Sequence, residues 1–253
     1  MRLTDEEITS YRERGYLLRS AVLSEEEIRL LRTAVPDLIT HNTQATLTNK
    51  GNGEVRLVFG PHQASEAYAN VMRLPRVLEP ARQLLGGDVY AHQTKVTLNT
   101  RAGGEGWVWH QDYAFWRSRD RVPGPDILSA AVFLDDVTHV NGPLFIVPGS
   151  HRGGLLETQD GVLDRERISE VCEVNGIDVP TGPAGSVLYF HGSAIHGSPG
   201  NISPFDRRIL YITYNAVTNA PEPFADMPPD YVAATDHSAL NTVDDSALLA
   251  ATA

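Results

Sequence analysis

The N-terminal third of the chain carries the apolar spacing and the start signals of helices. Apolar side chains recur at intervals of three or four residues in one segment, at Ile28, Leu31, Val35 and Leu38. That spacing gives a helix one apolar face. Thr4 with Glu7, and Ser24 with Glu27, match the S/T-x-x-E capping box, in which both side chains accept hydrogen bonds from free backbone N–H groups. We therefore predict a helix after each box, the first ending at Gly15.

A third helix and then a change of pattern follow. Pro75 suits the first position of a helix and Gly86 the position just past its end, so we predict a helix between them. After Asp88 the chain changes to short runs that are rich in β-branched and aromatic residues and bounded by Gly, Pro, Asn and Asp. Five such runs occupy residues 89–98, 127–137, 142–149, 185–192 and 207–217.

These elements predict a mainly β fold, a β-sandwich or jelly roll with the N-terminal helices packed on one side. The chain has no internal repeat and no linker, so residues 1–253 are expected to form one domain. Within it, residues 1–87 would be mainly helical, residues 88–219 would form the jelly-roll core and residues 220–253 a C-terminal tail. The tail is proline-rich and then polar, which predicts that it covers part of the surface and frays at its end.

Composition narrows the class of protein. The chain is 42% hydrophobic and 21% charged, as is usual for a protein that buries a core. A formal net charge of −11 argues against a nucleic-acid partner, which would need a basic face. No stretch approaches the roughly 18 apolar residues of a membrane span, and the N-terminus lacks the apolar region of a signal peptide. With Cys172 as the single cysteine, we expect a reducing, cytoplasmic location.

Candidate chemistry begins at GWVWHQDYAFW, residues 106–116, where His110 and Asp112 stand one residue apart among aromatic side chains. If this stretch is a strand, the imidazole and the carboxylate point to the same face and converge. They could form a simple hydrogen-bonded pair, or supply two of the ligands of non-haem iron(II). That site needs two imidazoles and one carboxylate on one side of the metal. The second imidazole would come from a distant strand, and both His191 and His196 qualify.

An arginine pair near the last strand adds to this pattern. Arg207 and Arg208 open the apolar run 207–217. A 2-oxoglutarate cosubstrate carries a carboxylate at its far end, which a planar guanidinium binds through two hydrogen bonds. Strand alternation implies that only one of the two arginines points inward, but it does not say which. Without the histidines nearby, an exposed arginine pair at a strand edge would be the ordinary interpretation.

Together these motifs resemble a known family. The chain resembles the phytanoyl-CoA dioxygenase-like superfamily of Fe(II)/2-oxoglutarate-dependent oxygenases, and within it the branch of ectoine hydroxylases and bacterial amino-acid hydroxylases. The resemblance runs from about Val55 to Asn219. It is carried by motifs in the family's order: VYAHQTKV, WHQDYAFW, NGPLFIVPGSHRGG, PTGPAGSVLYFHGSAIHGSPGNISPFDRR and YNAVTN.

The resemblance implies a role for individual residues. The iron ligands would be His110, Asp112 and His196. His196 is preferred to His191 because it opens the family's HGSxGN pattern. The residues expected to bind 2-oxoglutarate are Arg207, Ser198, Gln93, Asn99 and Trp107. The residues expected to bind or flank the substrate are Arg56, His62 and Trp116.

The resemblance also implies a double-stranded β-helix, a cupin-like jelly roll, that uses Fe(II), 2-oxoglutarate and O2. Halide-transferring members have glycine or alanine where this chain has Asp112, so hydroxylation is expected rather than halogenation. The expected reaction hydroxylates an unactivated C–H bond of a small polar substrate, a free amino acid or a related secondary-metabolite building block, with succinate and CO2 as coproducts.

Two alternatives stay open at this stage. The first is a hydroxylase of an acyl thioester or of a larger natural-product intermediate, although a net charge of −11 suits a polyanionic partner poorly. The second is a non-catalytic jelly-roll binding module, which would not need the complete ligand set. A further group, Arg117, Arg119 and Arg121, could clamp an acidic substrate or lie in water, and we favour water.

Overall fold

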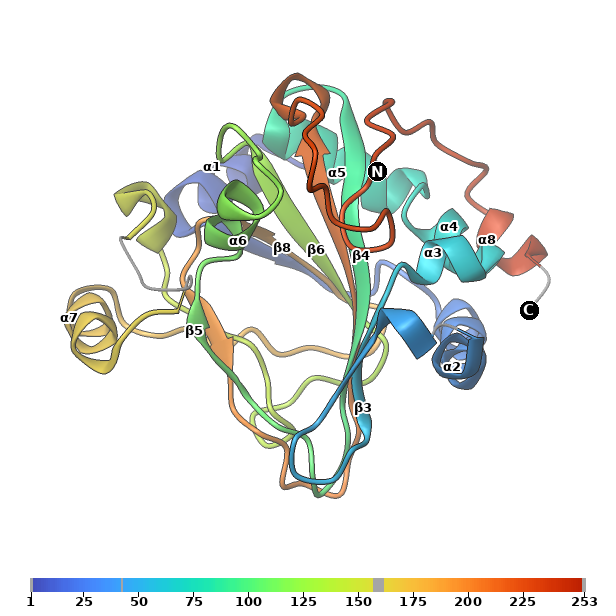
Figure 1. The fold of residues 1–253 in the computed structure, drawn as a ribbon, viewed down its shortest axis with the longest axis horizontal. Coiled ribbons are helices and arrows are strands. Elements are labelled where there is room, and N and C mark those ends of the chain that lie inside the picture. The colour runs from blue at the N-terminus through green and yellow to red at the C-terminus, as the bar shows by residue number, and fades with distance from the viewer. Residues whose placement is uncertain (1, 42, 157–161, 252–253) are drawn as a thin grey trace.

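Two antiparallel sheets face each other in the computed structural model, which describes residues 2–41, 43–156 and 162–251 (Figure 1). The strands are β1 (Tyr16–Arg19), β2 (Thr46–Thr48), β3 (Val55–Phe59), β4 (Val89–Asn99), β5 (Trp107–His110), β6 (Ile127–Phe133), β7 (Phe145–Ile146), β8 (Val187–His191), β9 (His196–Ser198) and β10 (Arg207–Ala216). The large sheet has the order β1-β8-β6-β10-β4-β3-β2 and the small sheet the order β5-β9-β7. This arrangement is a jelly roll, and all five predicted strand runs lie in it.

Helices cover the outer side of the large sheet. The helices are α1 (Asp5–Arg14), α2 (Glu25–His41), α3 (Pro61–Ala64), α4 (Glu66–Val71), α5 (Pro75–Leu85), α6 (Asp112–Ser118), α7 (Arg165–Asn175) and α8 (Ala247–Ala250), with short 3-10 turns at Thr43–Ala45, Ser150–Gly153 and Val217–Asn219. Figure 1 shows α2 to α5 and α8 beyond the large sheet, on the side away from the small sheet, and α7 beyond the small sheet. The N-terminal helices therefore pack on one side of the jelly roll, as predicted.

The three predicted helices begin and end where the sequence signals stand. Before α1 the hydroxyl of Thr4 accepts a hydrogen bond from the Glu7 N–H, and the Glu7 carboxylate accepts one from the Thr4 N–H. Gly15 closes this helix in the left-handed conformation at φ 79°. Ser24 and Glu27 make the same reciprocal pair before α2. Both capping boxes are confirmed, and so is the helix from Pro75 to Leu85.

The central strands of the large sheet are buried on both faces. In β6, Leu128 and Ala130 pack into the core that the sheet shares with the helices, whereas Ala131 and Phe133 belong to the core between the two sheets. Because neighbouring residues of a strand point to opposite faces, a strand covered on both sides needs a continuous apolar run. In β10 the same alternation directs the side chain of Tyr211 toward the small sheet.

The C-terminal tail ends in a packed helix rather than a frayed one. Leu248 of α8 is fully buried and Ala251 is nearly so, and both belong to the core that the helices share with the large sheet. Farther upstream, the Leu240 N–H donates to the carbonyl of Val89 at 2.9 Å. The predicted fraying is therefore wrong up to residue 251, because the apolar run ALLA gains more from burial than the chain loses in freedom. Residues 252–253 lie outside the described part.

In the described ranges, no helix is long and apolar enough to cross a membrane. The longest helix, α2, has 17 residues and carries acidic groups in its first turn.

Candidate metal centre and its cavity

Two histidines face each other across the small sheet. His110 is the last residue of β5 and His196 the first of β9, and the two are direct partners in the antiparallel register. Their ring centroids lie 4.2 Å apart. Strand pairing therefore brings together two side chains that are 86 positions apart in the sequence. The structure places His196, and not His191, beside His110.

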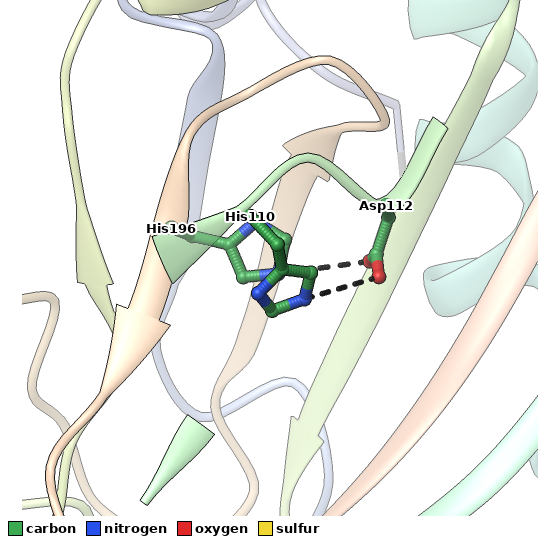
Figure 2. Close-up of side chains that lie close together, drawn as sticks. All are labelled: His110, Asp112 and His196. Carbon is green, nitrogen blue, oxygen red and sulfur yellow. Dashed lines mark ion pairs between the residues drawn. The ribbon is translucent and has the colours of Figure 1, made fainter. Parts of the chain in front are cut away.

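Asp112 reaches the same point from a helix. It is the first residue of α6, so the prediction that His110 and Asp112 share one face of a strand is wrong. The buried Gln111 between them ends the strand, because its side-chain amide donates to the carbonyl of Ser193 at 2.7 Å and to that of Gly154 at 2.8 Å. The carboxylate still points toward both imidazoles, as Figure 2 shows, and it stands where the free N–H groups of a helix start favour negative charge.

The three side chains are spaced as metal ligands are. The His110 Nε2 lies 3.5 Å from Asp112 Oδ1, and the His196 Nε2 lies 3.7 Å from Asp112 Oδ2. One ligand atom from each residue lies within 4.8 Å of the other two. A cation with metal–ligand distances of about 2 Å fits among atoms at this spacing.

Backbone carbonyls orient both imidazoles. The His110 Nδ1 lies 2.7 Å from the carbonyl of Val108, and the His196 Nδ1 lies 2.9 Å from that of Ala194. A carbonyl only accepts, so each Nδ1 carries the hydrogen and each Nε2 presents a lone pair to the common point. Three acceptors that face one another are stabilised by a cation between them, which is the usual arrangement around a metal-ligating histidine.

Burial and a nearby lysine set the charges of this group. Burial by itself would raise the pKa of Asp112, but Lys95, His196 and His110 more than offset it and hold that pKa below its usual range. The Lys95 Nζ lies 3.9 Å from Asp112 Oδ1. Burial, followed by the proximity of His110, lowers the pKa of His196 to about 4. Near neutral pH, Asp112 is thus charged and His196 neutral, the forms in which both bind metals.

The triad opens into a cavity of about 330 Å³ between the two sheets. Four of the predicted site residues line it beside the triad: Gln93, Trp107, Trp116 and Ser198. Most of the remaining wall is apolar and includes Leu47, Leu57, Phe59, Val108, Phe115, Leu144 and Val162. The cavity has the size and the mixed wall of a small-molecule site.

Arg207 lies directly behind this wall. It is 1% exposed, and its Nη2 donates to the Ser198 Oγ at 3.5 Å. Its Nε has no hydrogen-bond partner, and within the described ranges no carboxylate pairs with it. Burial lowers the pKa of Arg207, because a charged group that has lost its water is less stable than the same group in solution. Arg207 is thus a buried cation without a carboxylate partner in the described ranges, one hydroxyl away from the cavity.

Comparison with known proteins assigns the family. The family model of phytanoyl-CoA dioxygenase (PhyH) matches residues 11–209. The chain belongs to the phytanoyl-CoA dioxygenase family. L-proline trans-4-hydroxylase from Streptomyces griseoviridis is 36% identical to this family member over 226 residues, which cover 82% of this chain and 84% of that enzyme.

Two further relatives of this phytanoyl-CoA dioxygenase family member are ectoine enzymes. Ectoine dioxygenase from Bordetella parapertussis is 33% identical over 240 residues, 87% of this chain and 78% of that enzyme. The crystal structure of EctD from S. alaskensis with 2-oxoglutarate and 5-hydroxyectoine matches with a TM-score of 0.88 at 31% identity, and covers 95% of this chain and 87% of that one. The resemblance stated from the motifs is confirmed, and so is the jelly roll.

Besides Arg207, three of the residues expected in the site of this family member do not line the cavity. Asn99 lies beside the cavity wall, where its amide donates to the carbonyl of Pro199 at 3.4 Å. Arg56 stacks over the ring of Trp107 at 3.9 Å, and its Nη1 donates to the carboxylate of Glu105 at 2.9 Å. The carboxylate of Glu105 thus pairs with the Arg56 guanidinium, which was expected to bind the substrate.

The remaining expected residue, His62, contacts the outer face of β4. Its Nδ1 lies 2.6 Å from the hydroxyl of Thr94, and burial lowers its pKa. Thr94 points to the face of β4 opposite to Gln93 and Lys95, which line the cavity. His62 is therefore separated from the cavity by the strand itself.

Sequence reasoning missed several wall residues, among them Lys95, Thr97 and Tyr211. Lys95 had a visible signal, because it is the single charged residue in the apolar run 89–98. A lysine in a strand that is otherwise covered on both faces needs a polar place to point to. Here that place is the cavity, where Lys95 lies near Asp112 and 5.6 Å from the centre of the Tyr211 ring.

Proposed function

We propose that this chain is an Fe(II)- and 2-oxoglutarate-dependent dioxygenase that hydroxylates an unactivated C–H bond of a small polar substrate, a free amino acid or a related building block. The observation that carries the proposal is the convergence of His110, Asp112 and His196 in the wall of the cavity. Two neutral imidazoles and a carboxylate on one side of a site are the ligands that suit Fe(II) and leave positions open.

The cosubstrate fits the same cavity. Arg207 offers an unpaired, buried guanidinium Nε, and Ser198 offers a hydroxyl beside it. One carboxylate of 2-oxoglutarate would satisfy both, because a charged hydrogen bond removes the cost of an unpartnered buried donor. Gln93 and Trp107 would complete this end of the cavity. Iron(II) bound with 2-oxoglutarate and O2 supplies the oxidising power for hydroxylation and releases succinate and CO2.

The protein itself would orient the metal ligands and surround the substrate with apolar side chains. The imidazoles are held by backbone carbonyls, and the carboxylate by the start of α6, so the ligands need little rearrangement. The apolar wall offers a carbon skeleton few polar partners besides the metal site. The shape of the cavity would decide which substrate carbon faces the metal, and a displacement of that carbon by about 1 Å changes the reaction rate substantially.

The substrate class rests on the relatives and on the cavity. Relatives found in the comparison include an L-proline trans-4-hydroxylase and ectoine dioxygenases, whose names give L-proline and ectoine as substrates. A cavity of about 330 Å³ has room for a molecule of that size. A cytoplasmic location, with Cys172 reduced, completes the proposal. Arg56 and His62, which were expected from the resemblance to contact the substrate, do not line the cavity and have no part in the proposed site.

The test is anaerobic reconstitution with Fe(II) and 2-oxoglutarate. We expect a weak visible charge-transfer band, and stabilisation of about 2.7 kcal/mol when the ligands are present at about 100 times their Kd. Asp112→Ala and His196→Ala should abolish both signals, whereas His139→Ala, at an exposed histidine away from the cavity, should keep them. A band of unchanged strength in the triad variants would contradict the proposed metal site.

A further inference from the structure

Helix α6 turns one face to the cavity along its whole length. The wall includes Asp112, Phe115, Trp116 and Arg119, which stand at the i, i+3, i+4 and i+7 positions of that face. Asp112 belongs to the metal site at the start of the helix. Arg119, the residue that caps its end, is about 10 Å farther along the helix axis. The helix thus carries a metal ligand at one end of the cavity and a cation at the other.

Of the three arginines in this segment, one reaches the cavity. Arg117 is exposed and does not line it, and the guanidinium of Arg121 lies 4.3 Å from the ring of Phe224. Arg119 lines the cavity with 42% of its side chain accessible. All three arginines are exposed, as expected, and Arg119 is the one that also lines the cavity.

A buried carboxylate holds this guanidinium in place. Asp120 is 1% exposed, and its two oxygens accept from Arg119 Nε and, at 2.7 Å, from Arg119 Nη2. On its other side, Asp120 Oδ2 lies 2.9 Å from the Nε2 of the equally buried His92. A side chain anchored this way loses little conformational freedom when it binds a ligand. In the described residues, the Nη1 of Arg119 donates to no protein group. This nitrogen of the guanidinium is therefore available to a ligand.

Three cations in or beside the cavity could bind an anion, and they have different surroundings. Arg207 is buried behind Ser198 and suits the cosubstrate, while Lys95 stands next to Asp112. Between these groups and Arg119 the wall is mainly apolar. A molecule with a compact apolar body and one carboxylate would span this region with its carboxylate on Arg119 and its carbon skeleton toward the metal.

We propose that Arg119 binds the carboxylate of the prime substrate, and that Asp120 and His92 are positioning residues for it. This inference rests on the proposed function and deepens it, because it restricts the substrate to small free carboxylic acids of the amino-acid type. A derivative with a neutral carboxamide would offer the free Nη1 of Arg119 an uncharged acceptor in place of a carboxylate, and so a weaker hydrogen bond.

The test compares acids with their amides on the reconstituted enzyme. A panel of free amino acids that includes L-proline, and the matching carboxamides, is screened for stimulated succinate release. We expect only the acids to stimulate release. For the best acid, Arg119→Gln should raise KM about 10- to 100-fold, with Arg119→Lys in between. Arg117→Gln, two positions away and outside the cavity, is the matched control and should behave as the wild type.

The outcomes separate this proposal from the proposed function. The KM for 2-oxoglutarate and the visible band should be unchanged in Arg119→Gln, because that residue lies away from the cosubstrate end. Asp120→Asn should raise the substrate KM in the same direction, again with the band intact. Equal stimulation by acids and amides, no stimulation by any acid, or equal KM values in Arg119→Gln and Arg117→Gln would overturn the role of Arg119 alone. Absence of the band in the wild type would overturn the proposed function, and this inference with it.

Discussion

Arg207 and Arg208 are neighbours in the sequence and have opposite surroundings. Arg207 shares a face of β10 with Tyr211, toward the small sheet, and has no carboxylate partner in the described ranges. Arg208 points the other way, where its Nε and Nη2 donate to the carboxylate of Asp135 at 2.7 and 2.8 Å. The same residue type is thus left without a carboxylate partner in one place, where we propose that it binds the cosubstrate, and forms a structural ion pair in the next.

This pair provides a matched test. We expect Arg207→Gln to raise the KM for 2-oxoglutarate about 10- to 100-fold, because a charged hydrogen-bond donor to the cosubstrate is lost. Arg208→Gln should leave that KM unchanged and lower the free energy of unfolding by about 1–3 kcal/mol, since Asp135 loses two charged hydrogen bonds and keeps only Arg32 as an ion-pair partner. Initial rates at varied 2-oxoglutarate and urea unfolding measure the two effects. A raised KM in Arg208→Gln would contradict the assignment.

At the scale of elements, the strand-to-helix turn at Gln111 and the docking of α8 are the features that local patterns did not show. A histidine and an aspartate two residues apart are typical of one strand face, yet here Gln111 ends the strand through contacts with Ser193 and Gly154. Those partners are 82 and 43 positions away, outside any local window. The carboxylate and the imidazole converge all the same, because the helix start points back at the strand end.

The tail helix is open to a direct test. Leu248 is fully buried, whereas its neighbour Leu249 is 43% exposed. We expect Leu248→Ala to lower the free energy of unfolding by about 2–4 kcal/mol, because a cavity opens in the core beneath α8. Leu249→Ala should change it by less than about 0.5 kcal/mol. Chemical denaturation of both variants decides the matter, and similar effects in the two would mean that α8 does not dock on the core.

On the scale of the whole molecule, the core joins segments from both ends of the chain. The largest apolar cluster contains residues from Tyr11 to Ala251 and includes both the helices and the large sheet. Polar groups enclosed with it make stability depend on pH. His191, next to His151 at a ring distance of 5.1 Å, has a pKa that burial, and then His151, lower to about 4.

The sign of this dependence follows from proton binding. In the unfolded chain His191 takes up a proton near pH 6.5, and in the folded protein only near pH 4, so the unfolded state binds more protons between these values. We expect the metal-free protein to lose roughly 2 kcal/mol of stability through this residue between pH 7 and pH 5. His196 acts in the same direction.

Urea unfolding at the two pH values measures this loss. His191→Asn keeps an acceptor for the Ser193 N–H, which now donates to the ring Nδ1 at 3.0 Å, and removes the titration. The variant should show a smaller fall in stability than the wild type, while His139→Asn at an exposed site should match the wild type. An equal fall in His191→Asn and in the wild type would rule out His191 as the source.

Much of this protein could be read from its sequence, because the signals are local. The capping boxes of Thr4 and Ser24, the stop at Gly15 and the continuous apolar strand runs depend on neighbouring residues alone, and each is confirmed. The motif order that marks the family is a linear property as well, and the family match bears it out.

Only the tertiary structure decided which side chains meet. The family motif had already favoured His196 over His191, but its meeting with His110 rests on strand register, and a one-residue shift would turn either side chain to the other face. The start of α6 at Asp112, the docking of α8 and the place of Arg119 at the cavity depend on contacts between distant segments. Local spacing therefore predicted the elements and the kinds of ligand, whereas long-range pairing decided the site.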